Sequence, residues 1–361
     1  MSPRSVRLSD VAEAAGVSVP TASQVMNGTG RVAEQTRRRV LEVARQLDYR
    51  PNALARSVAL GRSRTIGVLA ENAAGAFCMP VLIGINRALS SRDLASFLYD
   101  ARHNPAVRHD HVRHMIDRQV DGIIVIGEGA DVDIAELGER FDGPVVHAFG
   151  PHDPPHAVSV HPDERAAGAL AAERLLELGR TRIAHVTAER SLPSARERED
   201  GFTAALAAAG VVPAAVFHGD FTRAWGQHAA DAVLAVRPAV DAVFAANDAI
   251  AIGLAAALAA RGARIPEDIA LIGYDNVAGY GDDVDPYLTS IDPRLQLVGE
   301  RAATVLIAAL ADEASDARPI APRLAEGVST SGGGDATRRE LVEALLRSTT
   351  APAVGTPSPE Y

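Results

Sequence analysis

Short apolar runs rich in β-type residues alternate with helical patterns along most of the chain, from residue 65 to about residue 290. The runs that we expect to form strands are 66–70, 95–99, 122–126, 145–149, 183–187, 242–246 and 269–274. The clearest helical patterns are 164–178, 203–209, 226–236, 249–260 and 295–310. This alternation predicts an α/β fold, with parallel sheets that carry helices on both faces. Ligands of such folds bind beyond the carboxyl ends of the strands.

The expected sheets carry no motif of a nucleotide-dependent enzyme. No GxGxxG follows the first expected strand, and the GxxxxGK[ST] phosphate loop is excluded because the chain contains no Lys. The sequence also supports no Ser-His-Asp or paired-carboxylate arrangement. We therefore expect a binding protein that has no cofactor and is not an enzyme.

Composition bounds the number of domains and the compartment. With 361 residues, of which 47% are hydrophobic and 23% charged, the chain is long enough for two or three globular domains. No apolar stretch approaches the roughly 20 residues of a membrane span, and residues 1–9 lack the apolar segment of a signal peptide. The single cysteine, Cys78, excludes an intrachain disulfide and a multi-cysteine metal site. We expect a cytoplasmic protein with no membrane partner.

Charge is divided unevenly along the chain. Residues 1–62 hold ten Arg and five acidic residues, a net charge of +5, whereas the whole chain carries −10, so the remainder carries −15. Such asymmetry indicates a small polyanion-binding head on an acidic body. A solvated helical surface would give the same count, so charge alone leaves both interpretations open.

The basic head is expected to form three short helices. Apolar residues at helical spacing over 8–15 end at Gly16, which suits a left-handed helix end. Ser18 can cap a second helix at 19–26, and a third spans 34–47. Two short helices joined by a Gly-containing turn are typical of the helix-turn-helix, whose second helix enters the major groove of DNA. A small helical bundle without a DNA role remains the alternative from the pattern alone.

The actual string narrows these alternatives. The segment LSDVAEAAGVSVPTASQVMNGTGRV, with Thr36-Arg37 and Tyr49-x-Pro51-Asn52 after it, closely resembles the headpiece of the LacI/GalR family of bacterial transcriptional regulators. The match is ordered and nearly free of gaps over about fifty residues. The resemblance implies an N-terminal helix-turn-helix headpiece followed by a two-lobed Rossmannoid core that is similar to periplasmic binding proteins.

The resemblance also implies roles for headpiece residues. The positions expected to contact base edges are Val19, Pro20 and Gln24. The positions expected to hold the DNA backbone are Ser18, Thr21, Ser23, Asn27, Arg31, Tyr49 and Asn52. Backbone contacts fix the register, whereas base-edge contacts select the sequence. Gln24 departs from the Arg that is usual in the family, and because Gln pairs best with adenine and Arg with guanine, we expect an altered half-site.

Residues 51–58 resemble the hinge helix of the family, which folds on the operator and inserts apolar side chains into the minor groove. A helix this short is unstable alone in water. Arg56 and Val58 stand at the minor-groove positions. Because Val58 replaces the usual Leu, we expect a weaker kink. An ordinary linker is the alternative, and residues 61–64 fit it better.

The rest of the chain, to about residue 330, resembles the effector-binding core of the family. The marker strings are DGIIV at 121–125, NDAIAIG at 247–253 and IPEDIALIGYDN at 265–276. The resemblance implies an effector site formed by Phe77, Arg198, Phe221, Asn247, Asp248 and Asp275. An arginine fork with carboxamide and carboxylate partners suits vicinal hydroxyls, and an aromatic ring stacks on a flat ligand face.

Each of these residues has a simpler explanation. Phe77 and Phe221 could be core residues, and Asp248 could cap the helix that follows it. Arg198 and Asp275 favour the effector site more strongly, because an unpaired charge at a strand end is costly.

The nature of the effector is predicted from the segment ahead of Arg198. The family includes sugar sensors and a purine sensor, and Leu192 stands where the purine sensor has a base-contacting Arg. Cys78 replaces an expected second aromatic. We therefore expect a sugar or sugar-derived effector. The alternative is a co-repressor-dependent or activating member of the family with a purine-like effector.

Four histidines outside these motifs resemble a metal-binding cluster. His103, His109, His111 and His114 lie close together in sequence, but only 111 and 114 share a helix face, and no Cys joins them. We expect no metal site there.

Four segments are expected: the headpiece at 1–50, the hinge and linker at 51–64, the core at 65–330 and a flexible tail at 331–361. Within the core, lobe 1 covers about 65–161 and 293–322, and lobe 2 about 162–290. The tail holds too few heptads for a coiled coil, which favours a homodimer. We expect a dimeric repressor of carbohydrate-related genes, released from a palindromic DNA operator by a sugar-like effector.

Overall fold

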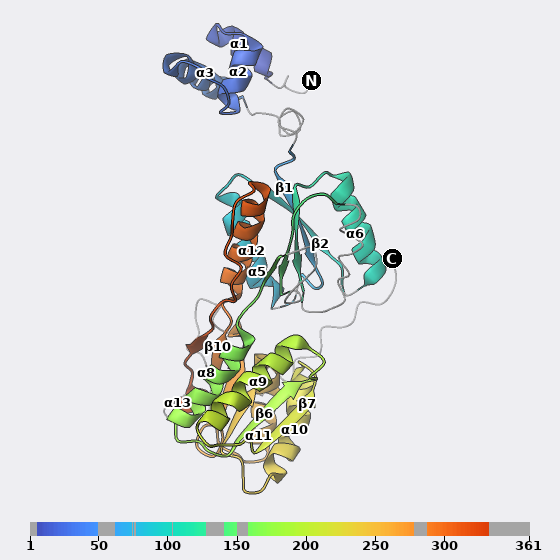
Figure 1. Cartoon of the computed structure of the whole chain (residues 1–361), viewed down its shortest axis with the longest axis vertical. Coiled ribbons are helices and arrows are strands. Elements are labelled where there is room, and N and C mark those ends of the chain that lie inside the picture. The colour runs from blue at the N-terminus through green and yellow to red at the C-terminus, as the bar shows by residue number, and fades with distance from the viewer. Residues whose placement is uncertain are drawn as a thin grey trace.

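The computed structural model describes residues 6–49, 62–73, 75, 77–102, 104–127, 141–149, 158–277 and 287–331. These residues form a helical headpiece and two α/β lobes (Figure 1). The expected α/β class is confirmed. The expected hinge helix and tail lie outside the described residues.

The headpiece contains α1 (Leu8–Ala15), α2 (Val19–Met26) and α3 (Glu34–Gln46). Gly16, at a φ of 62°, ends α1 in the left-handed conformation, and the Ser18 side chain accepts a hydrogen bond at the start of α2. The inward faces of the three helices meet in a core of their own, made of Val11, Ala12, Ala15, Ala22, Val25, Val40 and Ala44. The headpiece is thus a separately packed unit.

The first lobe is built on a five-stranded, all-parallel sheet in the order β2-β1-β3-β4-β5. Its strands are β1 (Thr65–Ala70), β2 (Ala95–Asp100), β3 (Gly122–Ile126), β4 (Val145–Ala148) and β5 (Val158–Val160). Its helices are α5 (Cys78–Ser90), α6 (Pro105–Asp117) and α12 (Leu295–Leu310). Helices α5 and α12 share one core with the sheet, and Met115 of α6 belongs to a second core with Leu69, Ile123 and Val125.

The second lobe has a six-stranded sheet in the order β11-β10-β9-β8-β6-β7, parallel except for β11. Its strands are β6 (Ile183–Ala188), β7 (Ala215–Gly219), β8 (Ala242–Ala245), β9 (Ala270–Tyr274), β10 (Thr289–Asp292) and β11 (Arg323–Ala325). Its helices are α8 (Glu164–Glu177), α9 (Pro193–Ala208), α10 (Arg223–Ala235), α11 (Asp248–Ala260) and α13 (Val328–Ser331). Separate cores join the sheet to α8 and α9 on one face and to α10 and α11 on the other.

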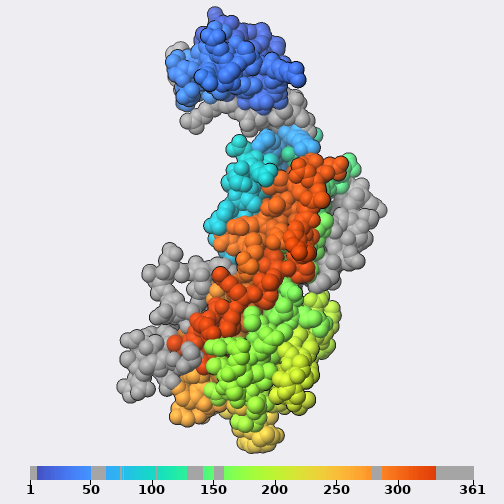
Figure 2. All heavy atoms as spheres, turned by 60° about the vertical axis from the view of Figure 1, so that its left-hand side comes forward, coloured from blue at the N-terminus to red at the C-terminus, as the bar shows by residue number. Residues whose placement is uncertain are grey.

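Within the described residues, the chain passes between the two sheets three times, at 161–163, at 293–294 and at 320–322. In Figure 2 the last passage is part of the orange-to-red band that runs from α12 to the second lobe. Each lobe is therefore assembled from segments that are distant in sequence.

Glycines bring the paired helices of each lobe into backbone contact. A Cβ on Gly201 of α9 would lie 2.0 Å from the Arg165 carbonyl oxygen of α8, and a Cβ on Gly168 of α8 would lie 2.0 Å from the Arg198 carbonyl oxygen of α9. Only glycine permits so close a crossing. The crossing sets Arg198 of α9 beside the first turn of α8.

Candidate DNA-binding surface and effector site

The residues expected to contact base edges lie on the exposed face of α2. Val19 is 45% exposed, and Pro20 and Gln24 are also exposed, whereas Ala22 and Val25 on the opposite face are buried. The Gln24 side chain lies against the turn after α2, where a Cβ on Gly30 would be 2.8 Å from its Cδ. None of these three residues belongs to the headpiece core of the described chain.

The residues expected to hold the DNA backbone make short polar pairs along α2. Ser18 Oγ lies 2.8 Å from Thr21 Oγ1, and the Asn27 side-chain amide donates to Ser23 Oγ at 3.3 Å. Arg31 is exposed, and Tyr49 packs half-buried against the headpiece core. Asn52, Arg56 and Val58 lie outside the described residues.

Arg198 is the centre of the candidate effector site. Its guanidinium is buried, pairs through Nε with Glu164 Oε2 at 2.7 Å and donates through Nη1 to the Ala246 carbonyl oxygen. It lies 3.6 Å from the ring centre of Tyr274 and 5.7 Å from that of Phe221. A buried charge is stabilised only when it is paired in this way.

Apart from Glu164, which opens α8, the groups around Arg198 lie at the carboxyl ends of strands in the second lobe. Ala246 and Asn247 follow β8, Phe221 follows β7, and Asp275 follows β9. Strands β6 and β8 are neighbours although they are not consecutive, so the sheet order reverses there. Ligands of open parallel sheets bind at such a reversal point.

The predicted residues Arg198, Phe221 and Asn247 are brought together. The Asn247 amide donates to the Phe221 carbonyl oxygen at 3.1 Å, which ties the end of β8 to the segment after β7. Asp275 is half-exposed, directly after Tyr274, and has a φ of 103°. Backbone in this region is strained for a residue with a side chain and is often found at ligand sites.

The alternative explanation of Asp248 as a helix cap is wrong. Asn247 is the cap of α11, because its Oδ1 accepts from the Ile250 amide at 2.8 Å. Asp248 is buried and accepts from Ser290 Oγ at 2.7 Å and from the Val277 amide at 2.9 Å. Burial raises the pKa of Asp248 to about 6. Its carboxyl group joins α11 to β10 and to the segment after β9.

Phe77 belongs to the first lobe, and within the described residues its ring makes no contact with the other predicted effector residues. It lies before α5, and its ring centre is 4.3 Å from that of Phe149, at the end of β4. It packs against the core of the first lobe, as the simpler explanation expected.

Two residues of the site were not predicted from the sequence. Glu164, in the first turn of α8, binds Arg198 and also accepts from the Tyr274 hydroxyl at 2.9 Å. Burial, followed by the nearby Glu164 charge, raises the pKa of Tyr274 well above 10. Glu164 and Tyr274 therefore hold the guanidinium from two different elements.

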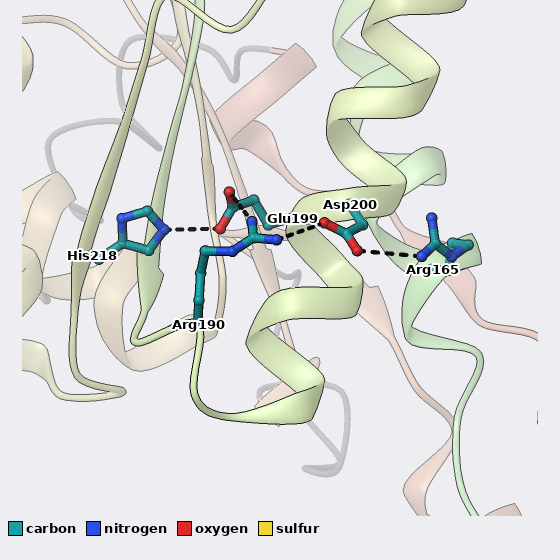
Figure 3. A network of polar contacts seen from close by, with 5 residues as sticks. All are labelled: Arg165, Arg190, Glu199, Asp200 and His218. Carbon is teal, nitrogen blue, oxygen red and sulfur yellow. Dashed lines mark hydrogen bonds and ion pairs between the residues drawn. The ribbon is translucent and has the colours of Figure 1, made fainter. Parts of the chain in front are cut away.

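The segment ahead of α9 forms a second polar network (Figure 3). Arg190 binds Glu199 and also Asp200, the latter at 3.0 Å. Asp200 also binds Arg165 at 3.3 Å, and Glu199 binds His218 Nε2 at 2.8 Å. Arg190 is thus directed along α9 and paired there, while Leu192 precedes the first turn of α9.

Two histidines of the sequence cluster, His111 and His114, lie beside Tyr99 of β2, whereas His109 is exposed. The His111 ring centre lies 4.9 Å from that of Tyr99, and that of His114 lies 6.5 Å from it. Among the residues that the structure describes, no group of three or more His, Cys, Asp or Glu is placed to hold a metal ion.

The described helices include none that is both long and apolar enough to cross a membrane.

Comparisons with known proteins agree with this architecture. Residues 7–52 match the family model for bacterial regulatory proteins of the lacI family, and residues 63–324 match that for periplasmic binding proteins and the sugar-binding domain of the LacI family. The transcriptional repressor PurR of Vibrio cholerae serotype O1 (strain M66-2) is 32% identical over 315 residues, which cover 86% of this chain and 93% of that protein.

Two solved structures are similar over nearly the whole chain. The lac repressor dimer bound to operator and the anti-inducer ONPF has a TM-score of 0.73 at 26% identity, covering 91% of this chain and 99% of that one. The regulator CelR in complex with cellobiose has a TM-score of 0.65 at 28% identity, covering 89% and 98%. These relatives are transcriptional regulators and not enzymes. The chain belongs to the LacI family of bacterial regulatory proteins, and it is a DNA-binding transcriptional regulator.

Proposed function

We propose that this chain is a homodimeric, cytoplasmic repressor that binds a palindromic operator and leaves it when a small sugar-like effector binds the second lobe. The observation that carries the proposal is the meeting of Arg198, Phe221 and Asn247 at the reversal point of the second sheet. The arginine, carboxamide and carboxylate of Arg198, Asn247 and Asp275 suit the hydroxyls of a sugar, and Phe221 suits its apolar face.

The headpiece supports the operator half of the proposal. The exposed face of α2 presents Val19, Pro20 and Gln24 for the major groove, with Ser18 and Thr21 at its N-terminal rim. The remaining backbone positions and the minor-groove positions Arg56 and Val58 complete the proposed contacts. Because Gln pairs with adenine, replacing Gln24 with Arg should shift the preferred half-site towards guanine.

A homodimer is supported by exposed apolar side chains in the first lobe. Phe97 and Leu98 are 44% and 50% exposed on β2, the edge strand of the sheet, and Met79 and Ile83 are exposed on the adjacent α5. A two-fold partner would cover these side chains and place two headpieces on the two halves of a palindrome. Leu98→Glu should therefore yield monomers in analytical ultracentrifugation, whereas Val212→Glu, at an exposed site in the second lobe, should not.

The first lobe is also where the headpiece is attached. The Asp121 carboxylate accepts from the backbone amides of Ser63 and Arg64 at 2.7 and 2.8 Å, and the Arg62 guanidinium donates to the carbonyl oxygen of Leu310, the last residue of α12. A change in the first lobe is thus passed directly to the segment that leads to the headpiece. Effector and operator would then favour different arrangements of the lobes, so each changes the affinity for the other.

The second candidate is a co-repressor-dependent regulator with a purine-like effector. The curated relatives with the name PurR favour it. The segment ahead of α9 favours the sugar instead. Arg190 is paired with Glu199 and Asp200, and Leu192 stands directly before α9. In the described structure, no arginine of this segment is therefore directed towards the site to contact a purine base.

Fluorescence anisotropy with a palindromic duplex from the region upstream of the chain's own gene tests the proposal. We expect binding that weakens steeply with salt and is lost on adding one sugar from a panel. Binding that is strengthened by a purine base would select the second candidate. Absence of binding at low salt, with and without ligands, would refute the operator half of the proposal.

A further inference from the structure

The charges at the effector end of the second lobe are already paired within the protein. Arg198 and Glu164 form an ion pair in which both side chains are less than a tenth exposed. In the neighbouring network, Arg190 is paired with Glu199 and Asp200, and Arg165 with Asp200 (Figure 3). Each of these three arginines therefore has a carboxylate as its counter-ion.

The geometry makes the Glu164 pair a fixed part of the site. Glu164 lies one turn before Gly168, where α8 and α9 are in backbone contact, so the backbones that carry Glu164 and Arg198 are held close together. The Tyr274 hydroxyl donates to the same carboxylate at 2.9 Å, and its ring lies under the guanidinium at 3.6 Å. Three elements thus hold the pair in one arrangement.

We infer that Glu164 is a positioning residue that restricts the effector to molecules without a negative charge. This inference rests on the proposed effector site and specifies its ligand: a neutral polyhydroxyl compound, and not a phosphorylated or carboxylated sugar. A phosphate or carboxylate would meet Arg198, whose charge Glu164 already balances. It would also meet the carboxyl group of Asp275, which directly follows Tyr274 at the end of β9. Such an anion would lose its hydration without gaining a free cation. A hydroxyl group needs only hydrogen-bond partners.

Inorganic phosphate is the probe that tests this inference without knowledge of the effector. The only tryptophan, Trp225, lies in the second lobe and donates through Nε1 to the Thr187 carbonyl oxygen at 3.0 Å, so its fluorescence reports on this lobe and not on the basic headpiece. The full-length protein is titrated with phosphate, and chloride of equal ionic strength serves as the reference. The wild type should show no saturable change.

Glu164→Gln keeps the shape of the side chain but removes its charge, so it should bind phosphate at least about tenfold more tightly than the wild type, a difference of roughly 1.4 kcal/mol. Glu173→Gln, at an exposed position of the same helix, is the matched control and should behave as the wild type. Tyr274→Phe removes one hydrogen bond but keeps the Glu164 charge, and should also remain unresponsive. This variant separates the effect of charge from that of lost packing.

Saturable phosphate binding by the wild type, or its absence in a folded Glu164→Gln variant, would overturn the inference. If Glu164→Gln does not fold, the wild type is titrated with two ligand pairs, glucose with glucose 6-phosphate and ribose with ribose 5-phosphate. A Trp225 response to only the phosphorylated member of a pair overturns the inference. The absence of any phosphate-dependent response supports it. Operator binding is measured on the same samples. If the wild type does not bind operator, the proposed function itself is refuted. If the wild type binds both operator and phosphate, only the exclusion of anions is refuted.

Discussion

At the scale of single residues, Arg198 has an observed structural role and a proposed role in effector binding. Its guanidinium fills a buried position that Glu164, the Ala246 carbonyl oxygen and the Tyr274 ring all stabilise. The same group lies at the strand ends where a ligand of this fold is expected. A substitution at this position should therefore alter both stability and effector response, and the two effects need separate measurements.

Arg198→Met should lower the free energy of unfolding by about 3 kcal/mol or more, because it leaves the Glu164 carboxylate buried without its cation. It should also abolish the effector response while operator binding persists. Chemical denaturation followed by Trp225 fluorescence measures the first effect, and operator anisotropy with effector measures the second. Arg196→Met, at an exposed position of the same helix, should change neither. An intact effector response in Arg198→Met would remove Arg198 from the site.

His185 gives a prediction for the pH dependence of stability. Its ring is fully buried between Phe202 and Phe244, and its Nδ1–H donates to the Phe244 carbonyl oxygen at 2.9 Å. Burial lowers its pKa from 6.5 to about 4. The unfolded chain therefore binds a proton that the folded chain does not, so the stability from neutral His185 is present above pH 6.5 and is lost as the pH falls towards 4.

His185→Asn keeps a donor for the carbonyl oxygen but does not titrate in this range. The stability of the wild type relative to this variant should fall by about 3 kcal/mol between pH 6.5 and pH 4. Urea denaturation at half-unit pH steps measures the free energy of unfolding of both proteins. The difference between the two values removes the contribution of all other titrating groups. If the two proteins lose stability in parallel, the ionisation of His185 is not coupled to folding.

At the scale of elements, sequence patterns predicted most of the strands. Strands β1, β2, β3, β4, β6, β8 and β9 lie within about one residue of their predicted bounds. All of them except the edge strand β2 are largely buried, and parallel strands covered by helices are continuous apolar runs. Strand β7 is half-exposed, β5 and β11 have three residues each, and the buried residues of β10 include Thr289, Ser290 and Asp292. Their residues carry no apolar pattern that marks a strand.

The start of α9 was missed for a related reason. The helix was expected from residue 203 but begins at Pro193, where a proline is tolerated because the amide is not needed. Its first turns bury Ser194, Arg198 and Glu199, so the buried face is polar and shows no hydrophobic period. Arg198 on this face belongs to the candidate effector site.

A usable signal for Glu164 was nevertheless present in the sequence. Glu164, Gly168, Ala171 and Leu175 follow one another at spacings of four, three and four, which places a carboxylate on the apolar face of the expected helix. A charge in that position requires a buried partner. The identity of the partner could not be predicted, because Arg198 and Tyr274 come from elements far away in the sequence.

The contact between α8 and α9 can be tested with one methyl group. Gly201→Ala would place a Cβ 2.0 Å from the Arg165 carbonyl oxygen, so the helices must separate. We expect a loss of about 1–3 kcal/mol in the free energy of unfolding, together with weaker effector binding as Glu164 and Arg198 move apart. Denaturation and effector titration measure the two effects. Ala204→Ser, which adds one atom on the exposed face of α9, should leave both unchanged; equal behaviour of the two variants would show that the close crossing is not required.

At the scale of the whole molecule, the connections between parts define the route from effector to DNA. Three passages of the described chain join the lobes, and Arg294 in the second of them has a left-handed φ of 62°. Any change in the angle between the lobes must be taken up in these passages. The first lobe then carries the change to residues 62–64, which Asp121 and the end of α12 hold in place.

The proposed function requires that the operator and the effector bind one coupled molecule. The most direct measurement is a titration of Trp225 fluorescence with the sugar that releases the operator, performed once on the free protein and once with saturating operator duplex. Saturating operator should weaken the binding of the sugar by the same factor by which the sugar weakens the binding of operator, because coupling free energy is reciprocal. A sugar affinity that saturating operator leaves unchanged would contradict it.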